Sequence, residues 1–258
     1  MDNYLPSLNF IDLKKQQENI REDINFAISK VLDHGKYIMG PEVFEFEDDL
    51  KNFTGAKHVI SCANGTDALT IALMALGVKQ DDVIFVPSFT YIASVESITQ
   101  LGAIPFYVDV NIDTFNIDLE SLKNAILDAR KMNLNIFGIM PVDLFGQPAQ
   151  VDLIQNIADE NNLKILIDAA QSFGGEYKNK KVGNYGDITT TSFFPAKPLG
   201  CYGDGGALFT NCDELYEKIS SIRLHGKGSH KYEHIQIGVN SRLDTIQAAI
   251  LQTKLKIY

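Results

Sequence analysis

Short apolar segments alternate with longer amphipathic segments along most of the chain. The short segments predict strands at residues 58–61, 83–87, 105–109, 136–142, 164–168, 189–193 and 207–210. Between the first five, apolar residues recur at i, i+3 and i+4, which predicts helices at residues 68–76, 92–101, 119–131 and 151–161. This alternation predicts an α/β fold, a mostly parallel seven-stranded sheet with helices on both faces.

The two ends of the chain complete the predicted fold. The segments 11–32 and 42–53 have helical spacing, and the first should end near His34-Gly35. Only a loop separates the last two strands, so one of them should run antiparallel. A final amphipathic helix is predicted to carry Leu243, Ile246, Ile250 and Leu255.

Composition and charge exclude several classes of function. Hydrophobic residues make up 45% of the 258 residues and charged residues 22%, as in ordinary globular proteins. The net charge of −10 argues against a nucleic-acid partner. No apolar run is long enough for a membrane span, and residues 1–6 lack the pattern of a secretory signal. Three scattered cysteines predict neither a disulfide framework nor a zinc cluster, and favour the cytoplasm.

Lys197 is the residue with the most informative surroundings. It lies among proline, aromatic and glycine residues, which is unusual for a solvated lysine. A lysine can form a Schiff base with an aldehyde cofactor, and an aspartate such as Asp168 can keep the pyridine nitrogen of that cofactor protonated. Together they point to pyridoxal 5'-phosphate (PLP). The alternative is a surface lysine that never meets Asp168, with Asp168 capping a helix over 169–171.

A phosphate site is predicted after the first strand. Gly65 and Thr66 open a helix, whose free N–H groups and dipole suit an anion, and Thr66 adds a hydroxyl donor. Ser192 ends the strand that enters the lysine loop and could reach the same phosphate. Simple capping of the helix or strand end is the alternative for each residue.

Three further side chains are candidates for contacts with the cofactor or the substrate. Tyr91 could stack on a flat heterocycle, although a core aromatic is equally compatible with its position. Gln171 lies close after Asp168 and could bond a ring substituent. Arg242 could clamp a carboxylate or phosphate, unless it forms an ordinary surface ion pair. The histidines show no metal-ligand spacing, so no metal is expected.

With these residues assembled, the sequence resembles the DegT/DnrJ/EryC1/StrS family of sugar aminotransferases, which are PLP enzymes of fold type I. The match runs from Leu8 to the last residue. The motifs that carry it lie at residues 61–69, 87–94, 142–148, 168–174, 192–200 and 240–249.

The resemblance implies a role for each candidate. Lys197 matches the Schiff-base lysine and Asp168 the partner of the pyridine nitrogen. Gln171 matches the residue beside the ring oxygen and Tyr91 the stacking aromatic. The residues that match the phosphate cup are Gly65, Thr66 and Ser192.

The resemblance also implies a substrate and an assembly. Asn240 matches a residue that reaches the phosphate from the neighbouring subunit, which implies a homodimer with a shared active site. Arg242 falls where subfamily members contact the sugar nucleotide. The expected reaction is transamination at C3 of a UDP-linked 2-acetamido-3-keto sugar, with glutamate as the amino donor. Residues 1–240 would form the PLP-binding domain with an N-terminal helical segment. Residues 241–258 would begin a linking helix to a small C-terminal domain that is largely missing.

Three other functions stay open at this point. A PLP-dependent sugar dehydratase shares the fold, but such enzymes carry histidine where this chain has Lys197. A non-catalytic regulatory or scaffolding relative is the second. A dinucleotide-binding domain is the third, although no GxGxxG follows the first strand.

Overall fold

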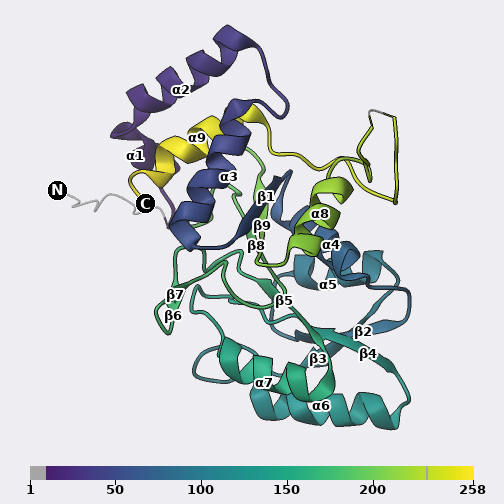
Figure 1. The fold of residues 1–258 in the computed structure, drawn as a ribbon. Coiled ribbons are helices and arrows are strands. Elements are labelled where there is room, and N and C mark those ends of the chain that lie inside the picture. The colour runs from purple at the N-terminus through teal and green to yellow at the C-terminus, as the bar shows by residue number, and fades with distance from the viewer. Residues whose placement is uncertain (1–9, 231) are drawn as a thin grey trace, which may run out of the picture.

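A seven-stranded sheet forms the centre of the molecule in the computed structural model, which describes residues 10–230 and 232–258 (Figure 1). The strand order is β1-β9-β8-β5-β4-β2-β3. Only β9 runs antiparallel to its neighbours, because every other pairing is parallel. The predicted sheet and its one reversed strand are therefore confirmed. The strands are β1 (His58–Cys62), β2 (Asp82–Pro87), β3 (Ile104–Val108), β4 (Asn135–Ile139), β5 (Lys164–Asp168), β8 (Ile188–Ser192) and β9 (Gly206–Thr210).

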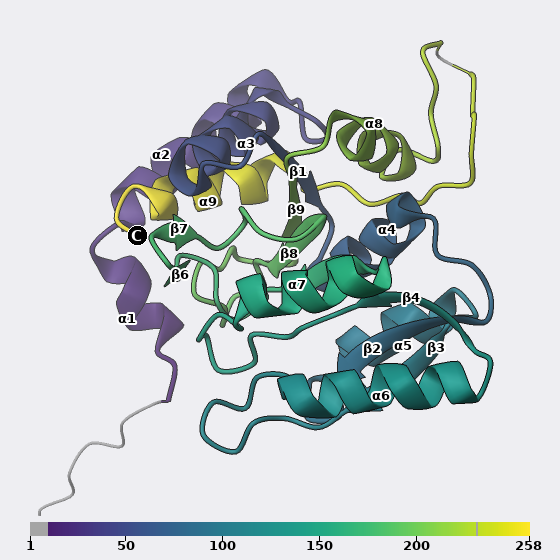
Figure 2. The same cartoon turned by 60° about the horizontal axis from the view of Figure 1, so that its bottom comes forward.

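Helices cover both faces of this sheet (Figure 2). One face packs against α4 (Gly65–Leu76), α5 (Ile92–Gln100) and α8 (Asp213–Ile222). The other face packs against α6 (Leu119–Lys131) and α7 (Val151–Asn161) under β2 to β5. Under β1 and β9 the same face packs against α3 (Pro41–Thr54) and α9 (Thr245–Leu255). The side chains of a strand alternate between the faces, so Val59 and Ile60 enter different cores.

The sequence also encodes where several helices begin and end. Gly35 and Gly55 adopt left-handed backbone angles at the ends of α2 (Arg21–His34) and α3, where other residues are strained. Pro41 occupies the first turn of α3, where no N–H partner is lost. The Asn64 side chain caps α4 by accepting a bond from Asp67 N. These signals account for the agreement in the helix boundaries.

The structure differs from the predicted elements in four places. The segment 11–32 forms α1 (Leu13–Glu18) and α2, because the chain leaves helical geometry at Ile20, whose side chain is buried. The fourth strand ends at Ile139 and not at 142, since Pro141 has no N–H to continue the ladder. Leu243 precedes α9 and is not part of it. The helix α8 and the small hairpin of β6 (Glu176–Tyr177) and β7 (Lys180–Lys181) were not predicted.

Two remaining sequence-based expectations concern the ends of the chain. None of the helices formed by residues 10–230 and 232–258 combines the length and hydrophobicity needed to cross a bilayer. Leu8, where the family resemblance begins, and the N-terminal residues 1–6 lie outside the described residues.

Candidate active site

A cavity of about 650 Å³ opens at the carboxyl ends of β1, β5 and β8, where open α/β sheets bind ligands. Lys197 and Asp168 both line it, so the alternative in which these two residues never meet is wrong. The other predicted residues in the lining are Gly65, Thr66, Tyr91, Gln171 and Ser192. The fold therefore brings seven residues from four distant sequence motifs to one site.

Asp168 lies at the end of β5 as a buried carboxylate with two hydrogen bonds. Its Oδ2 accepts a bond from the Ser94 hydroxyl at 2.7 Å, and its Oδ1 accepts one from Ala170 N at 3.2 Å. Burial raises the pKa of Asp168, and the bond from Ser94 opposes that rise. No helix begins at Ala169, so the alternative of a helix cap is wrong. The buried carboxylate thus faces the cavity with a strengthened affinity for a proton.

Lys197 lies on the β8–β9 loop and is half buried. Its Nζ donates a hydrogen bond to Gln171 Oε1 at 3.2 Å. Burial lowers the pKa of the Lys197 amine, and the charge of Asp168 partly opposes this. A lowered pKa increases the neutral fraction of the amine, which is the nucleophilic form.

Close packing shapes the N-terminus of α4 into a cradle at one end of the cavity. A Cβ on Gly65 would lie 2.7 Å from the Cβ of Ser192. A Cβ on Gly206 would lie 2.5 Å from the carbonyl oxygen of Asn64. Only glycine at these positions lets the helix start approach β8 and β9 so closely. The N–H groups, the Thr66 hydroxyl and the Ser192 hydroxyl beside them fit a phosphate.

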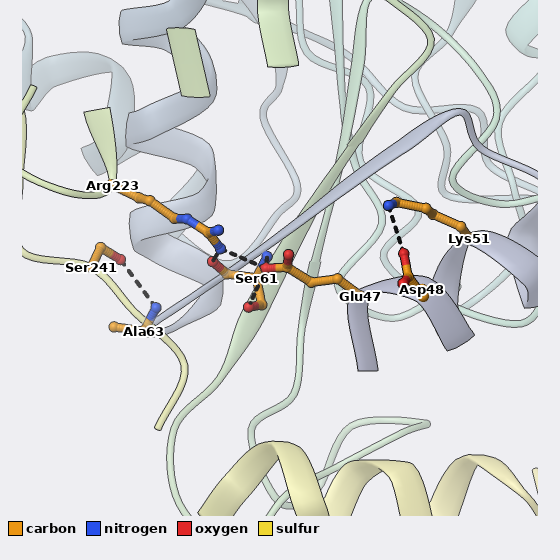
Figure 3. Close-up of polar contacts among 7 residues, drawn as sticks. All are labelled: Glu47, Asp48, Lys51, Ser61, Ala63, Arg223 and Ser241. Carbon is orange, nitrogen blue, oxygen red and sulfur yellow. Dashed lines mark hydrogen bonds and ion pairs between the residues drawn. The ribbon is translucent and has the colours of Figure 1, made fainter. Parts of the chain in front are cut away.

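A buried ion pair stabilises the backbone that leads into this cradle (Figure 3). Arg223 Nη1 lies 2.5 Å from Glu47 Oε1 and 2.8 Å from the Ser61 carbonyl oxygen. The same Glu47 oxygen accepts bonds from the Ser61 N–H and hydroxyl. Just beyond, Ala63 N donates to Ser241 Oγ at 3.0 Å. These contacts join α3, the end of β1, and the segment that follows α8, immediately before the start of α4.

The remaining candidates occupy different positions. Tyr91 stands at the mouth with 70% of its surface exposed, so the alternative of a core aromatic is wrong. Asn240 is exposed and Arg242 half buried, and neither lines the cavity of its own chain. Their predicted contacts stay predictions. Within the described residues, no group of three or more His, Cys, Asp or Glu side chains could hold a metal ion.

Ser94 and Asp143 are polar residues of the site that sequence reasoning did not single out. Ser94 reaches Asp168 from the first turns of α5, and its sequence position gave no signal for that contact. Asp143 lines the cavity, is buried, and accepts bonds from Ser172 Oγ at 2.6 Å and Ala149 N at 2.9 Å. Burial raises the pKa of Asp143 to about 6. The signal available for Asp143 was its place directly after an apolar segment, like that of Asp168.

Comparisons with known proteins bear on this geometry. The sequence profile of the DegT/DnrJ/EryC1/StrS aminotransferase family matches residues 18–257. A Pseudomonas aeruginosa protein named UDP-2-acetamido-2-deoxy-3-oxo-D-glucuronate aminotransferase is 53% identical over 251 residues, covering 97% of this chain and 68% of that protein.

Solved structures share the fold. A crystal structure of a DegT DnrJ EryC1 StrS aminotransferase from Brucella abortus has a TM-score of 0.96 at 50% identity, covering 97% of this chain and 68% of that one. NtdA from Bacillus subtilis, with the cofactor PMP bound, has a TM-score of 0.90 at 32% identity, covering 99% of this chain and 57% of that one. This chain therefore spans about two thirds of the length of the relatives it matches.

Proposed function

Because the chain belongs to the DegT/DnrJ/EryC1/StrS aminotransferase family, we propose that it binds PLP and transfers an amino group to a nucleotide-linked keto sugar. The observation that carries the proposal is the shared cavity of Lys197 and Asp168, with the phosphate cradle of α4 beside them. The PMP-bound relative supports the choice of cofactor. When bound, PLP supplies an electron sink that acidifies the Cα–H bond of an amino donor.

Each polar residue of the cavity has a distinct task in this reaction. The neutral amine of Lys197 would hold the aldehyde carbon of the cofactor, and the same amine would move a proton to or from the Cα of the amino donor. Its lowered pKa favours both tasks. Asp168 would hold the proton on the pyridine nitrogen as a carboxylate, and the bond from Ser94 favours that ionised form against the effect of burial. Gln171 accepts a bond from the Lys197 amine and so orients it, and its side chain would bond the ring oxygen of the cofactor.

The phosphate and ring of the cofactor are held by the surrounding elements. Gly65, Thr66 and the Ser192 hydroxyl would bind the phosphate at the start of α4, where the helix dipole favours an anion. Tyr91, at the mouth of the cavity, would stack on the ring. Asp143 braces the turn after β5 through Ser172 and keeps Asp168 in place.

We further propose that the substrate is a UDP-linked 2-acetamido-3-keto sugar, aminated at C3 with glutamate as donor. The name and 53% identity of the Pseudomonas aeruginosa relative support this choice. Arg242 would contact the sugar nucleotide. Residues 1–240 would act as the cofactor-binding domain, and residues 241–258 as the start of the helix that links it to a second domain.

The proposed enzyme is a homodimer of the cytoplasm. Asn240 would reach the phosphate of the neighbouring subunit from its exposed position outside its own cavity. The cysteines Cys62, Cys201 and Cys212 are free, which is compatible with a reducing compartment.

Reconstitution tests the proposal. Purified protein mixed with PLP should develop the visible absorbance band of lysine-bound cofactor, and glutamate should bleach it. Lys197→Ala should abolish both signals because no other lysine of residues 10–230 and 232–258 lines the cavity. Lys180→Ala, which removes an exposed lysine of the β6–β7 hairpin, should behave as wild type. Normal transamination by the Lys197→Ala variant would end the assignment.

A further inference from the structure

Lys254 is a buried ammonium group that the proposed reaction does not use. It lies on α9 with 4% of its surface exposed. No carboxylate of residues 10–230 or 232–258 forms an ion pair with it. Lysines are almost never fully buried without a partner, because the desolvated charge is costly. A specific set of contacts must therefore hold it there.

Two hydrogen bonds and one aromatic ring surround the ammonium. Lys254 Nζ donates to the Gly200 carbonyl oxygen at 2.6 Å and to Gln16 Oε1 at 3.0 Å. It also lies 4.4 Å from the centroid of the Tyr202 ring, within the range of a cation–π contact. Two of the three partners, Gly200 and Tyr202, belong to the loop that carries Lys197.

Gly200 is the point where this loop closes on itself. A Cβ on Gly200 would lie 2.3 Å from the Pro195 carbonyl oxygen, so the backbone of the two residues is in close contact. Within the turn, Lys197 N donates to the Phe194 carbonyl oxygen at 2.8 Å. The close contact of Pro195 with Gly200 forms the base of a tight turn that contains Lys197. A contact that holds Gly200 in place therefore also holds this turn.

We propose that Lys254 is a positioning residue whose charged hydrogen bond to Gly200 fixes the turn that presents Lys197 to the cavity. A hydrogen bond from an ionised donor is roughly twice as strong as a neutral one, and it works against the cost of burial, which lowers the pKa of the Lys254 amine. The same helix holds the loop at a second point, because Gln247 Oε1 accepts a bond from Tyr202 N at 2.9 Å. Through Gln16 the ammonium also ties α1 to this loop.

The effect of Lys254 on the capture of PLP rests on the proposed function, whereas its hydrogen bond to Gly200 does not. The turn itself can be observed without cofactor, by hydrogen exchange of the backbone amides of residues 194–203. The capture of PLP by Lys197 can be followed separately, as the rate at which the visible band forms. Lys254→Met is the test variant, because it keeps the length of the side chain and removes the charge and donors. Lys256→Met, an exposed lysine at the end of the same helix, is the matched control.

Loss of a charged hydrogen bond predicts at least about tenfold faster exchange of the loop amides in Lys254→Met, with α6 amides unchanged. Band formation should slow by at least about tenfold for the same reason. Lys254→Arg keeps the donors and the charge, so its loop exchange and its rate of band formation should return part of the way to wild type. Lys256→Met should match wild type in both measurements.

Wild-type loop exchange in Lys254→Met would overturn the proposal. Faster exchange with an unchanged rate of band formation would also overturn it, because the contact would then be structural only. If wild-type protein forms no band at all, the proposed function fails, and loop exchange alone still decides whether Lys254 fixes the turn.

Discussion

Burial controls the charges of the residues that face the cavity. It raises the pKa of Asp168 and Asp143 and lowers that of Lys197, so each group is shifted towards its neutral form. Both oxygens of each carboxylate accept a hydrogen bond, those of Asp168 from Ser94 and Ala170 and those of Asp143 from Ser172 and Ala149. The two carboxylates differ in their charged neighbours. The Lys197 amine favours the ionised form of Asp168, whereas the charge of Asp168 adds to the rise in the pKa of Asp143.

Asp143 should make the stability of the protein depend on pH. Its pKa of about 6 in the folded protein lies above the ordinary value of 3.8. Its contribution to the stability of the fold is therefore complete below pH 3.8, where the carboxyl is protonated, and is lost as pH rises through 6. That shift corresponds to about 3 kcal/mol. Asp143→Asn can keep both hydrogen bonds and should not lose this energy. We therefore expect the free energy of unfolding in urea, measured from pH 4 to 8, to rise for the variant relative to wild type. The difference should reach up to about 3 kcal/mol at the high end of this range.

A difference between variant and wild type that stays constant with pH would contradict this account of Asp143. Asp128→Asn, at an exposed position on α6, provides the control and should show no comparable divergence.

The chemistry of single residues was predictable from sequence where motif and position agreed. Lys197 and Asp168 lie in motifs whose combination, rather than either residue alone, pointed to a cofactor site, and both line the cavity. Ser94 was not predictable, because its contact with Asp168 depends on the tertiary arrangement that brings the start of α5 to the end of β5. Burial of Asp143 likewise depends on the turn after β5, which the local sequence does not describe.

At the scale of elements, the junction of α4 with β8 and β9 determines the shape of the site. Gly65 has ordinary helical backbone angles, so a side chain there is excluded by its neighbour and not by strain. The antiparallel β9 brings Gly206 against the start of α4 from the other side. The cradle therefore depends on β8 and β9, which are neighbours in the sheet. The loop that carries Lys197 joins these two strands.

Gly65→Ala should widen this junction. The added Cβ would meet that of Ser192 at 2.7 Å, and such overpacking typically costs about 1–3 kcal/mol. We expect weaker binding of PLP by at least about tenfold, measured by titration of the visible band, because the N–H groups of α4 move away from the phosphate. Adding Ser192→Gly should relieve the clash and recover stability. Wild-type stability and affinity in Gly65→Ala would show that the close approach is unimportant.

Helices and strands with a regular spacing of apolar residues were predicted well, and elements without it were not. The strands and the helices α4 to α7 follow from periodic apolar positions, and Asn64 and Asp118 also cap α4 and α6. The break between α1 and α2 has no proline or glycine to mark it. The β6–β7 hairpin has two residues in each strand, too few for any alternation to be visible.

At the scale of the whole molecule, the segment after α8 extends away from the body (Figures 1 and 2). It exposes apolar side chains, with Ile235 at 65% and Ile237 at 85% exposure, before the chain returns to Asn240. This placement agrees with the proposal that Asn240 serves the cavity of a second copy.

Mixed dimers test the shared site directly. Lys197→Ala and Asn240→Ala should each be inactive alone, since each damages both sites of its own dimer. After the two are unfolded and refolded together, a mixed dimer has one site with both changes and one site with neither. About a quarter of wild-type activity should return, because half of the dimers are mixed and half of their sites are intact. No recovery would place Asn240 in the site of its own chain or outside the reaction.

The central claim is that the amine of Lys197 captures the aldehyde of PLP in this cavity. Borohydride reduction of the PLP-loaded protein makes that bond permanent, and mass spectrometry of the digested protein then locates it. The account predicts a pyridoxyl phosphate group on the peptide that contains Lys197 and on no other. A label on another lysine, or an unlabelled Lys197 peptide, would contradict it.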